Sequence, residues 1–126
     1  MFELYFYQDR RGNEPVWDYL QEIKRKSERD KNSRVQFNKL NDYLQALSEY
    51  GLAAGEPYIK HLEGDIWELR PLRNRVLFAA WSKNGFVLLH MFMKTTQKTP
   101  RREIEQAKRN LADFHERSNK SEARKH

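Results

Sequence analysis

Residues 60–100 read KHLEGDIWELRPLRNRVLFAAWSKNGFVLLHMFMKTTQKTP, and this stretch carries most of the information about the fold. Apolar residues fill four short runs separated by turn residues, a pattern that predicts consecutive β-strands at residues 58–62, 66–72, 75–83 and 86–94. Asn84-Gly85 lies between the last two runs, and this dipeptide is the strongest short signal for a two-residue hairpin turn. The sequence therefore predicts an antiparallel strand meander in the second half of the chain.

Outside this stretch, the sequence predicts one further strand and three helices. In residues 2–8, the apolar side chains of Phe2, Leu4 and Phe6 alternate with those of Glu3, Tyr5 and Tyr7. This alternation and the many aromatic residues favour a first strand. Two amphipathic helices follow, the first with Asn13 as its cap and Pro15 in its first turn, and the second with Ser33 as its cap. Pro100 opens a last helix. We therefore expect an α+β fold: an antiparallel sheet, formed by strand 1 and the C-terminal strand meander, with two N-terminal helices packed on one face and a C-terminal helix.

The length and the end of the chain predict one domain. A chain of 126 residues is long enough for a single hydrophobic core and too short to suggest two. Residues 1–118 are predicted to form this domain. Residues 119–126 are polar and charged, and we expect them to be a disordered tail because they offer too little apolar surface to bury.

The composition favours an acidic partner and excludes several kinds of site. The formal net charge of +6 points to nucleic acid first and to an acidic protein second. The chain has no cysteine, and its four histidines are too scattered for zinc, so we expect no thiolate nucleophile, no metal and no other cofactor. No apolar run approaches the ~20 residues of a membrane helix, and the first residues do not resemble a signal peptide. A cytoplasmic location is expected.

The predicted hairpin turn sets the register of its two strands. With residues 84–85 in the turn, Trp81 pairs with Leu88 and Arg75 pairs with Lys94. A four-residue turn before Arg75 places another cation, that of Arg70, directly opposite it. Basic side chains thus oppose one another across neighbouring strands.

Alternation of side chains then assigns the strand residues to two faces. One face mixes charged and apolar side chains, namely Glu68, Arg70, Arg75, His90 and Lys94 together with Leu77, Ala79, Trp81, Leu88 and Phe92. The opposite face is almost wholly apolar and must be covered by helices; its members are Trp67, Leu69, Val76, Phe78, Ala80, Val87, Leu89, Met91 and Met93.

Three basic residues of the mixed face, Arg70, Arg75 and Lys94, gather at one end of the sheet in this register. Like charges that oppose each other in a sheet are destabilising by up to about 1 kcal/mol per pair, so an anion is expected between them, with RNA preferred. The alternative is that Glu68 and the acidic turn at residues 63–65 neutralise these cations within the fold. Further basic, polar or aromatic residues enlarge the neighbourhood as candidates for binding RNA: Arg73, Gln97, Lys98, Arg101, Arg102 and Trp81.

The order of elements and three motifs together resemble a known toxin superfamily. The motifs are Ile-Trp-Glu-Leu-Arg (66–70), Arg-Val (75–76), and Leu-Leu-His-Met-Phe-Met-Lys (88–94) followed by Gln-Lys-Thr-Pro (97–100). On these residues the chain resembles the HigB-like branch of the RelE/ParE toxins of type II toxin-antitoxin systems, often described as phage-derived. The resemblance implies a RelE-like fold and a ribosome-dependent messenger RNA endonuclease, or mRNA interferase. It also implies a cognate antitoxin, expected to be a helix-turn-helix DNA-binding protein, as a partner besides the translating ribosome and its message.

The resemblance also implies the chemistry and its main residues. In such toxins the 2′-hydroxyl of the RNA attacks the adjacent phosphate, and this reaction requires no metal. Carried over to this chain, the residues that hold the phosphate are Arg70, Arg75 and Lys94, with Lys98 nearby, which coincides with the cluster given by the register. Arginine suits this task because its planar fork pairs with two phosphate oxygens and stays charged.

The residues that transfer protons are less closely defined by the sequence. Glu68 and His90 are the best-placed titratable groups on the mixed face, with His61 and Lys94 as alternatives. The chain has no tyrosine after Tyr58, which excludes a catalytic tyrosine near the C-terminus.

Two other functions remain open at the level of sequence. The ParE-like branch of the same fold inhibits DNA gyrase without cleaving RNA, and fold alone does not separate the two activities. A degenerate toxin that only binds its antitoxin is the third alternative.

Overall fold

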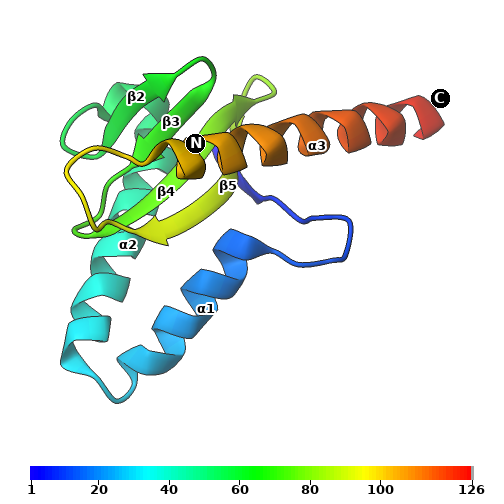
Figure 1. Cartoon of the computed structure of the whole chain (residues 1–126). Helices are drawn as coiled ribbons and strands as arrows, with labels where there is room; N and C mark the ends of the chain where they lie inside the picture. Colours follow the sequence, from blue (N-terminus) through cyan, green and yellow to red (C-terminus); the bar gives the residue numbers. More distant parts are fainter. Residues whose placement is uncertain (126) are drawn as a thin grey trace.

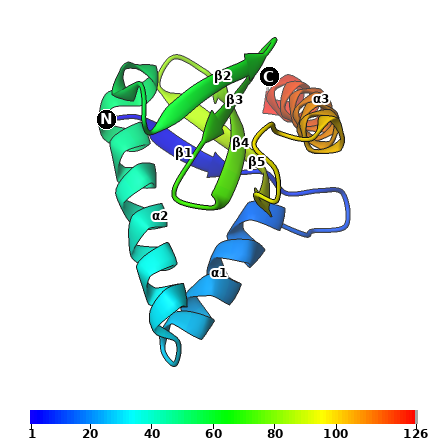
Figure 2. The same cartoon turned by 60° about the vertical axis from the view of Figure 1, so that its left-hand side comes forward.

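The computed structural model describes the backbone of residues 1–125 and the side chains of residues 1–118. A five-stranded sheet forms its centre, with the strand order β1-β5-β4-β3-β2. Helices α1 and α2 diverge as a V on one face of the sheet, and α3 lies on the other face (Figure 1 and Figure 2). The predicted α+β class, with two N-terminal helices on one face and a C-terminal helix, is confirmed. The elements are β1 (Glu3–Phe6), α1 (Pro15–Ser27), α2 (Lys31–Tyr50), the 3-10 helix η1 (Gly51–Ala54), β2 (Ile59–Glu63), β3 (Ile66–Leu69), β4 (Asn74–Trp81), β5 (Gly85–Met93) and α3 (Arg101–Lys125).

Strand β1 pairs with β5 in parallel, so the sheet is mixed. This corrects the expectation that strand 1 belongs to an antiparallel sheet. Short turns force the neighbours β2 to β5 to run antiparallel, whereas the long α1–α2 connection leaves the direction of β1 to packing. The amide of Tyr7, just beyond β1, continues the pairing by donating to the Leu88 carbonyl at 3.0 Å.

The hairpin between β4 and β5 has a three-residue turn at residues 82–84 instead of the predicted two-residue turn. Trp81 pairs with Gly85, and Ser82 adopts a positive φ of 58°. Gly85 lies within the strand, where an added Cβ would stand only 2.8 Å from the Tyr5 ring on β1. Close approach of two strands, and not turn geometry, therefore explains this glycine. The predicted register is wrong, including the pairs Trp81–Leu88 and Arg75–Lys94.

A β-bulge in β5 changes the register a second time. Leu77 pairs with His90, and the next residue, Phe78, pairs with Leu88, so Leu89 is the extra residue. The three-residue turn exchanges the faces predicted for Leu88 and its neighbours, and the bulge restores the predicted faces from His90 onward. Leu88 packs towards α1 and α2, and the residues on either side of it pack towards α3.

Both faces of the sheet are covered by apolar packing. The prediction is confirmed for Leu69, Val76 and Phe78, which are fully buried in the core beneath α1 and α2. The mixed face forms a second core, in which Leu77 and Phe92 pack with α3 residues such as Ala107 and Leu111. The polar end of that face, beside β3, remains open.

The caps of the two N-terminal helices differ from the predicted ones. Glu14 is the cap residue of α1, because Asn13 instead donates its side-chain amide to Asp9 in the preceding turn at 3.3 Å. Asp30 caps α2, and the Ser33 hydroxyl donates to the Asp30 carboxylate at 2.8 Å. Each predicted cap therefore bonds to an aspartate that precedes it.

Helix α3 is anchored to the segment that follows β1. Asp113 accepts hydrogen bonds from the Tyr7 hydroxyl at 2.6 Å, from Arg10 Nε at 2.9 Å and from Arg117 Nη2 at 2.9 Å. The helix continues to Lys125, so its backbone extends through most of the predicted tail. The side chains of residues 119–126 lie outside the described part of the chain, and the disorder of the tail stays a prediction.

The contacts of Asp113 predict a specific loss of stability in acid. The Tyr7 hydrogen bond, with Arg10 and Arg117, lowers the pKa of Asp113 to about 2, while burial and Asp113 raise the pKa of Tyr7 to about 12. A depressed carboxyl pKa stabilises the fold above the ordinary value of about 3.9, and this contribution is lost as the pH falls through about 2. We expect the urea midpoint of the wild type to fall more steeply between about pH 4 and pH 2 than that of Asp113→Asn. Parallel curves would contradict this assignment.

Candidate RNA-binding groove

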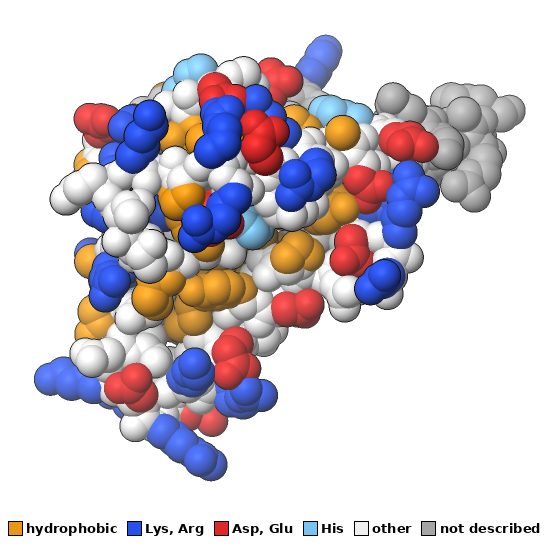
Figure 3. Space-filling model, in the orientation of Figure 1, with side chains coloured by type: hydrophobic (Ala, Val, Ile, Leu, Met, Phe, Trp, Pro, Cys, Tyr) orange, Lys and Arg blue, Asp and Glu red, His pale blue; other side chains and the backbone are white. Residues whose placement is uncertain are grey.

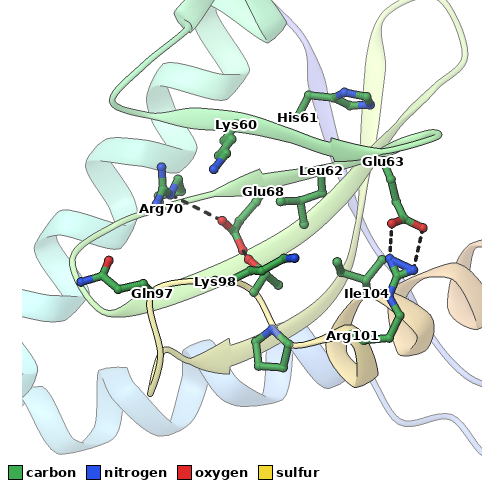
Figure 4. Close-up of a pocket in the computed structure, with 12 residues that line it drawn as sticks. Lys60, His61, Leu62, Glu63, Glu68, Arg70, Gln97, Lys98, Arg101 and Ile104 are labelled. Atoms are coloured by element: carbon green, nitrogen blue, oxygen red, sulfur yellow. Dashed lines mark hydrogen bonds and ion pairs between the residues drawn. The ribbon is translucent and has the colours of Figure 1, made fainter.

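A groove of about 650 Å³ opens at the polar end of the sheet. Strands β2 and β3, the start of α3 and the connecting loop (residues 94–100) that joins β5 to α3 form its walls (Figure 4). Basic side chains gather on this side of the molecule around the start of α3, with acidic ones between them (Figure 3). The lining residues are Lys60, His61, Leu62, Glu63, Glu68, Arg70, Gln97, Lys98, Thr99, Pro100, Arg101 and Ile104.

The carboxylate of Glu68 forms the centre of the groove floor. The residue is 1% exposed, although it is an acid on a β-strand. Its Oε1 lies 3.4 Å from Arg70 Nε and 3.8 Å from Arg75 Nε, and its Oε2 accepts a hydrogen bond from the Thr99 hydroxyl at 2.6 Å. A buried charge is tolerated when it is paired in this way.

Arg75 lies beneath the groove and is used inside the protein. It is 6% exposed, and its Nη1 donates to the backbone carbonyls of Leu72 at 2.7 Å and Asn74 at 2.9 Å. Burial lowers the pKa of the Arg75 guanidinium from its ordinary value, and the Glu68 carboxylate acts in the opposite direction. Arg75 therefore neutralises Glu68, as the alternative interpretation of the sequence expected.

Arg70 is held far less tightly than Arg75. Its side chain is 30% exposed, and its Nε is buried without a hydrogen-bond partner among the described residues, although the Glu68 carboxylate lies close by. Figure 4 shows the Arg70 side chain beside Lys60 at the edge of the groove. The guanidinium of Arg70 is therefore positioned by an ion pair and is still able to donate to a ligand.

Two lysines bring further positive charge to the groove. Lys60 on β2 is the cross-strand partner of Glu68 on β3, and Lys98 projects from the connecting loop towards the same space (Figure 4). In the part of the chain that the structure describes, neither Lys60 nor Lys98 makes an ion pair. Their charges are therefore available to an anion.

Arg101 lies at the groove but is paired within the fold. It bonds to Glu63 and also to Glu105, and Lys108, two turns further along α3, bonds to Glu63 as well. The Lys108 hydrogen bond, together with Arg101, lowers the pKa of Glu63. This cluster attaches the start of α3 to the end of β2 and closes one end of the groove.

Lys94 and Arg75 line a smaller hollow next to the groove, with Gln97 and Lys98 shared between the two. Lys94 lies opposite Arg73, because its amide donates to the Arg73 carbonyl at 2.7 Å, and Arg75 faces Phe92. The predicted trio of Arg70, Arg75 and Lys94 is therefore spread over two adjoining hollows.

Residues 20–112 match the model of a protein family described as Phage derived protein Gp49-like (DUF891). The chain belongs to this family. The Gp49-like family is a type II toxin-antitoxin toxin family in the RelE/ParE-like superfamily, and membership implies an antitoxin partner. Comparison with curated proteins gives no match. None of the described helices is long and apolar enough to cross a membrane.

Four residues predicted for this Gp49-like site line neither hollow, namely His90, Trp81, Arg73 and Arg102. His90 bonds to Glu103 on α3 at 3.0 Å, and Trp81 packs edge-on against Phe114 with ring centres 4.9 Å apart. Both side chains are partly covered by α3, whose position could not be derived from strand alternation. Arg102 is exposed on α3, and Arg73 donates through Nη2 to the Lys94 carbonyl at 3.3 Å. His61, one of the alternatives, borders the groove, but its ring packs near that of Trp67, with ring centres 4.7 Å apart.

Two polar groove residues of the Gp49-like chain, Lys60 and Thr99, were not among the predicted ones. Lys60 reaches the groove because β2 pairs with β3, and a bulge after His61 hides that register from a reading of the sequence. Thr99 hydrogen-bonds to Glu68, which lies 31 residues earlier in the sequence, and no local sequence pattern predicts a contact at that separation. Its place in the Gln-Lys-Thr-Pro motif was the one available signal.

Proposed function

We propose that this Gp49-like protein is a ribosome-dependent messenger RNA endonuclease of the HigB-like branch, and that its groove binds the phosphate at which the RNA is cut. The observation that carries the proposal is Arg70, an arginine that lines a basic groove and whose side chain makes no hydrogen bond to the residues that the structure describes. Arginine in that state is suited to bidentate contact with a phosphate.

The proposed reaction is an internal transesterification of the RNA. The 2′-hydroxyl oxygen loses its proton and attacks the adjacent phosphorus, and the bond to the 5′-oxygen of the next nucleotide breaks and that oxygen is protonated. A 2′,3′-cyclic phosphate and a 5′-hydroxyl result. Negative charge grows on the non-bridging oxygens during the attack, and preorganised cationic donors stabilise such charge most strongly.

We assign these tasks to the groove residues according to the solvent exposure of their side chains. Arg70 is proposed to contact the scissile phosphate, and Lys60 and Lys98 to neutralise the neighbouring backbone. Glu68 and Arg75 are nearly completely buried, so we assign them the task of holding Arg70 in place. The N-terminus of α3 borders the groove at Pro100 and adds its positive dipole end.

Primer extension on a translated message tests the proposal. Adding the purified protein to a reconstituted translation reaction is expected to produce new 5′ ends within the translated region, and omitting initiation is expected to remove them. Growth arrest without new RNA ends, accompanied by DNA-damage signalling, would instead support a ParE-like inhibitor of gyrase. Co-expression of a helix-turn-helix antitoxin is expected to abolish both the cuts and the arrest.

A further inference from the structure

The connecting loop (residues 94–100) has no regular secondary structure, and it contributes two polar side chains to the groove wall, those of Gln97 and Lys98. Its internal order is modest, with one side-chain bond from the Thr96 hydroxyl to the Lys98 carbonyl at 2.7 Å. Within the described residues, Thr99 has the one loop side chain that hydrogen-bonds to a strand, and at the start of the loop the Arg73 side chain donates to the Lys94 carbonyl at 3.3 Å. Thr99 therefore connects the loop that lines the groove to β3, the strand that ends one residue before Arg70.

The hydroxyl of Thr99 is directed at the sheet and not at its own helix. Threonine close to a helix start commonly caps the free amides of the first turn. Here the Pro100 carbonyl already accepts from the amides of Glu103 at 3.1 Å and Ile104 at 3.4 Å, and Thr99 donates to Glu68 at 2.6 Å. A capping function does not account for its orientation.

The two oxygens of Glu68 have different partners because of this bond. Oε2 accepts from Thr99, which leaves Oε1 towards the guanidinium groups of Arg70 at 3.4 Å and Arg75 at 3.8 Å. Without the hydroxyl, Oε2 would be a buried acceptor lacking a donor, and rotation of the carboxylate would relieve it. Such a rotation would move the one described group that holds Arg70.

We infer that Thr99 is a positioning residue, which orients Glu68 and through it places the Arg70 guanidinium at a fixed distance from Lys98 across the groove. This inference rests on the proposed function for its effect on cleavage. Its structural content, the coupling from Thr99 through Glu68 to Arg70, is independent of that function. Thr99 touches neither the RNA nor the reacting atoms in this assignment.

The cleavage kinetics of three loop variants test the effect of Thr99 on the reaction. Thr99→Val keeps the shape and removes the hydroxyl, and it is expected to lower the maximal rate of ribosome-dependent cleavage about tenfold with little change in KM. Thr99→Ser restores a donor and is expected to retain most of the rate. Thr95→Val, at an exposed loop position that lines neither hollow, is the matched control and should behave as the wild type.

A double-mutant cycle with Glu68→Gln separates positioning from general damage to the loop. If Thr99 acts through Glu68, the Thr99→Val change costs little or nothing further in the Glu68→Gln background. An undiminished tenfold loss in that background, or a wild-type rate for Thr99→Val alone, would overturn the inference.

Nitrogen NMR of the arginine side chains supplies a measure that does not depend on activity. The Nε–Hε resonances of Arg70 and Arg75 are expected to shift in Thr99→Val and to stay in place in Thr99→Ser and Thr95→Val. Unmoved Arg70 and Arg75 signals in Thr99→Val would refute the coupling even in a protein that cleaves RNA. Shifted signals in a protein that never cleaves RNA would support the coupling and refute the proposed function.

Discussion

Replacing Arg70 with alanine is expected to lower the rate of ribosome-dependent RNA cleavage by about 100-fold or more and to abolish growth arrest. Loss of one preorganised donor to a transition-state oxyanion typically costs about 10²–10³ in rate. The fold should survive, because the Arg70 side chain is 30% exposed and Glu68 keeps Arg75 and Thr99 as partners. Primer extension gives the rate, and urea unfolding checks the fold.

Two further variants test whether the loss of cleavage is caused by removing the guanidinium of Arg70 itself. Arg70→Lys keeps the charge and loses the planar fork, so an intermediate rate is expected. Arg109→Ala removes an exposed arginine of α3 that lines neither hollow, and it should leave cleavage unchanged. Wild-type cleavage by Arg70→Ala would show that the scissile phosphate lies elsewhere.

Replacing Glu68 with leucine is expected to lower the free energy of unfolding by about 3 to 5 kcal/mol, the usual cost of removing one partner of a buried ion pair. Arg75 would then remain 6% exposed without its carboxylate, and the Thr99 hydroxyl would lose its acceptor. Urea denaturation of the purified variant measures the change.

The double variant Glu68→Leu with Arg75→Met is the informative companion. Replacing both members of a buried pair with apolar residues of similar size is often neutral, so most of the lost stability should return. Glu28→Leu, at an exposed position, is expected to stay within about 0.5 kcal/mol of the wild type. If Glu68→Leu alone is as stable as the wild type, the buried charge network contributes nothing to the fold.

Local periodicity was sufficient to predict the elements of this fold. Apolar spacing of three and four residues marked α1 and α2, and alternation marked the four consecutive strands. The register was not predictable in the same way, because it depends on Gly85 meeting Tyr5 on a strand 80 residues away in sequence and on the unpaired Leu89. Likewise, the parallel direction of β1 follows from packing and not from a turn.

The candidate site was predictable where it depends on alternation within one strand. Glu68 and Arg70 share a face because they are two residues apart along the chain, and the four-residue turn before Arg75 places Arg75 on the same face; the structure brings the three together. Their different states could not be predicted, because burial by the connecting loop and by α3 decides which arginine remains open. Arg75 and Arg101 are neutralised by carboxylates within the fold, whereas Lys60 and Lys98 make no ion pair with the described residues.

The extra residue in β5, Leu89, limits the sequence changes that this chain can tolerate. Side chains alternate along a strand, so one inserted residue inverts the parity of everything after it. With even pairing from Phe86 onward, His90 would point into the apolar layer under α1 and α2, and Met91 would stand beside the buried guanidinium of Arg75. The length of β5 is therefore constrained more tightly than the identity of most of its residues: a conservative substitution perturbs one position, but a single-residue deletion would exchange the faces of all the β5 residues beyond the bulge.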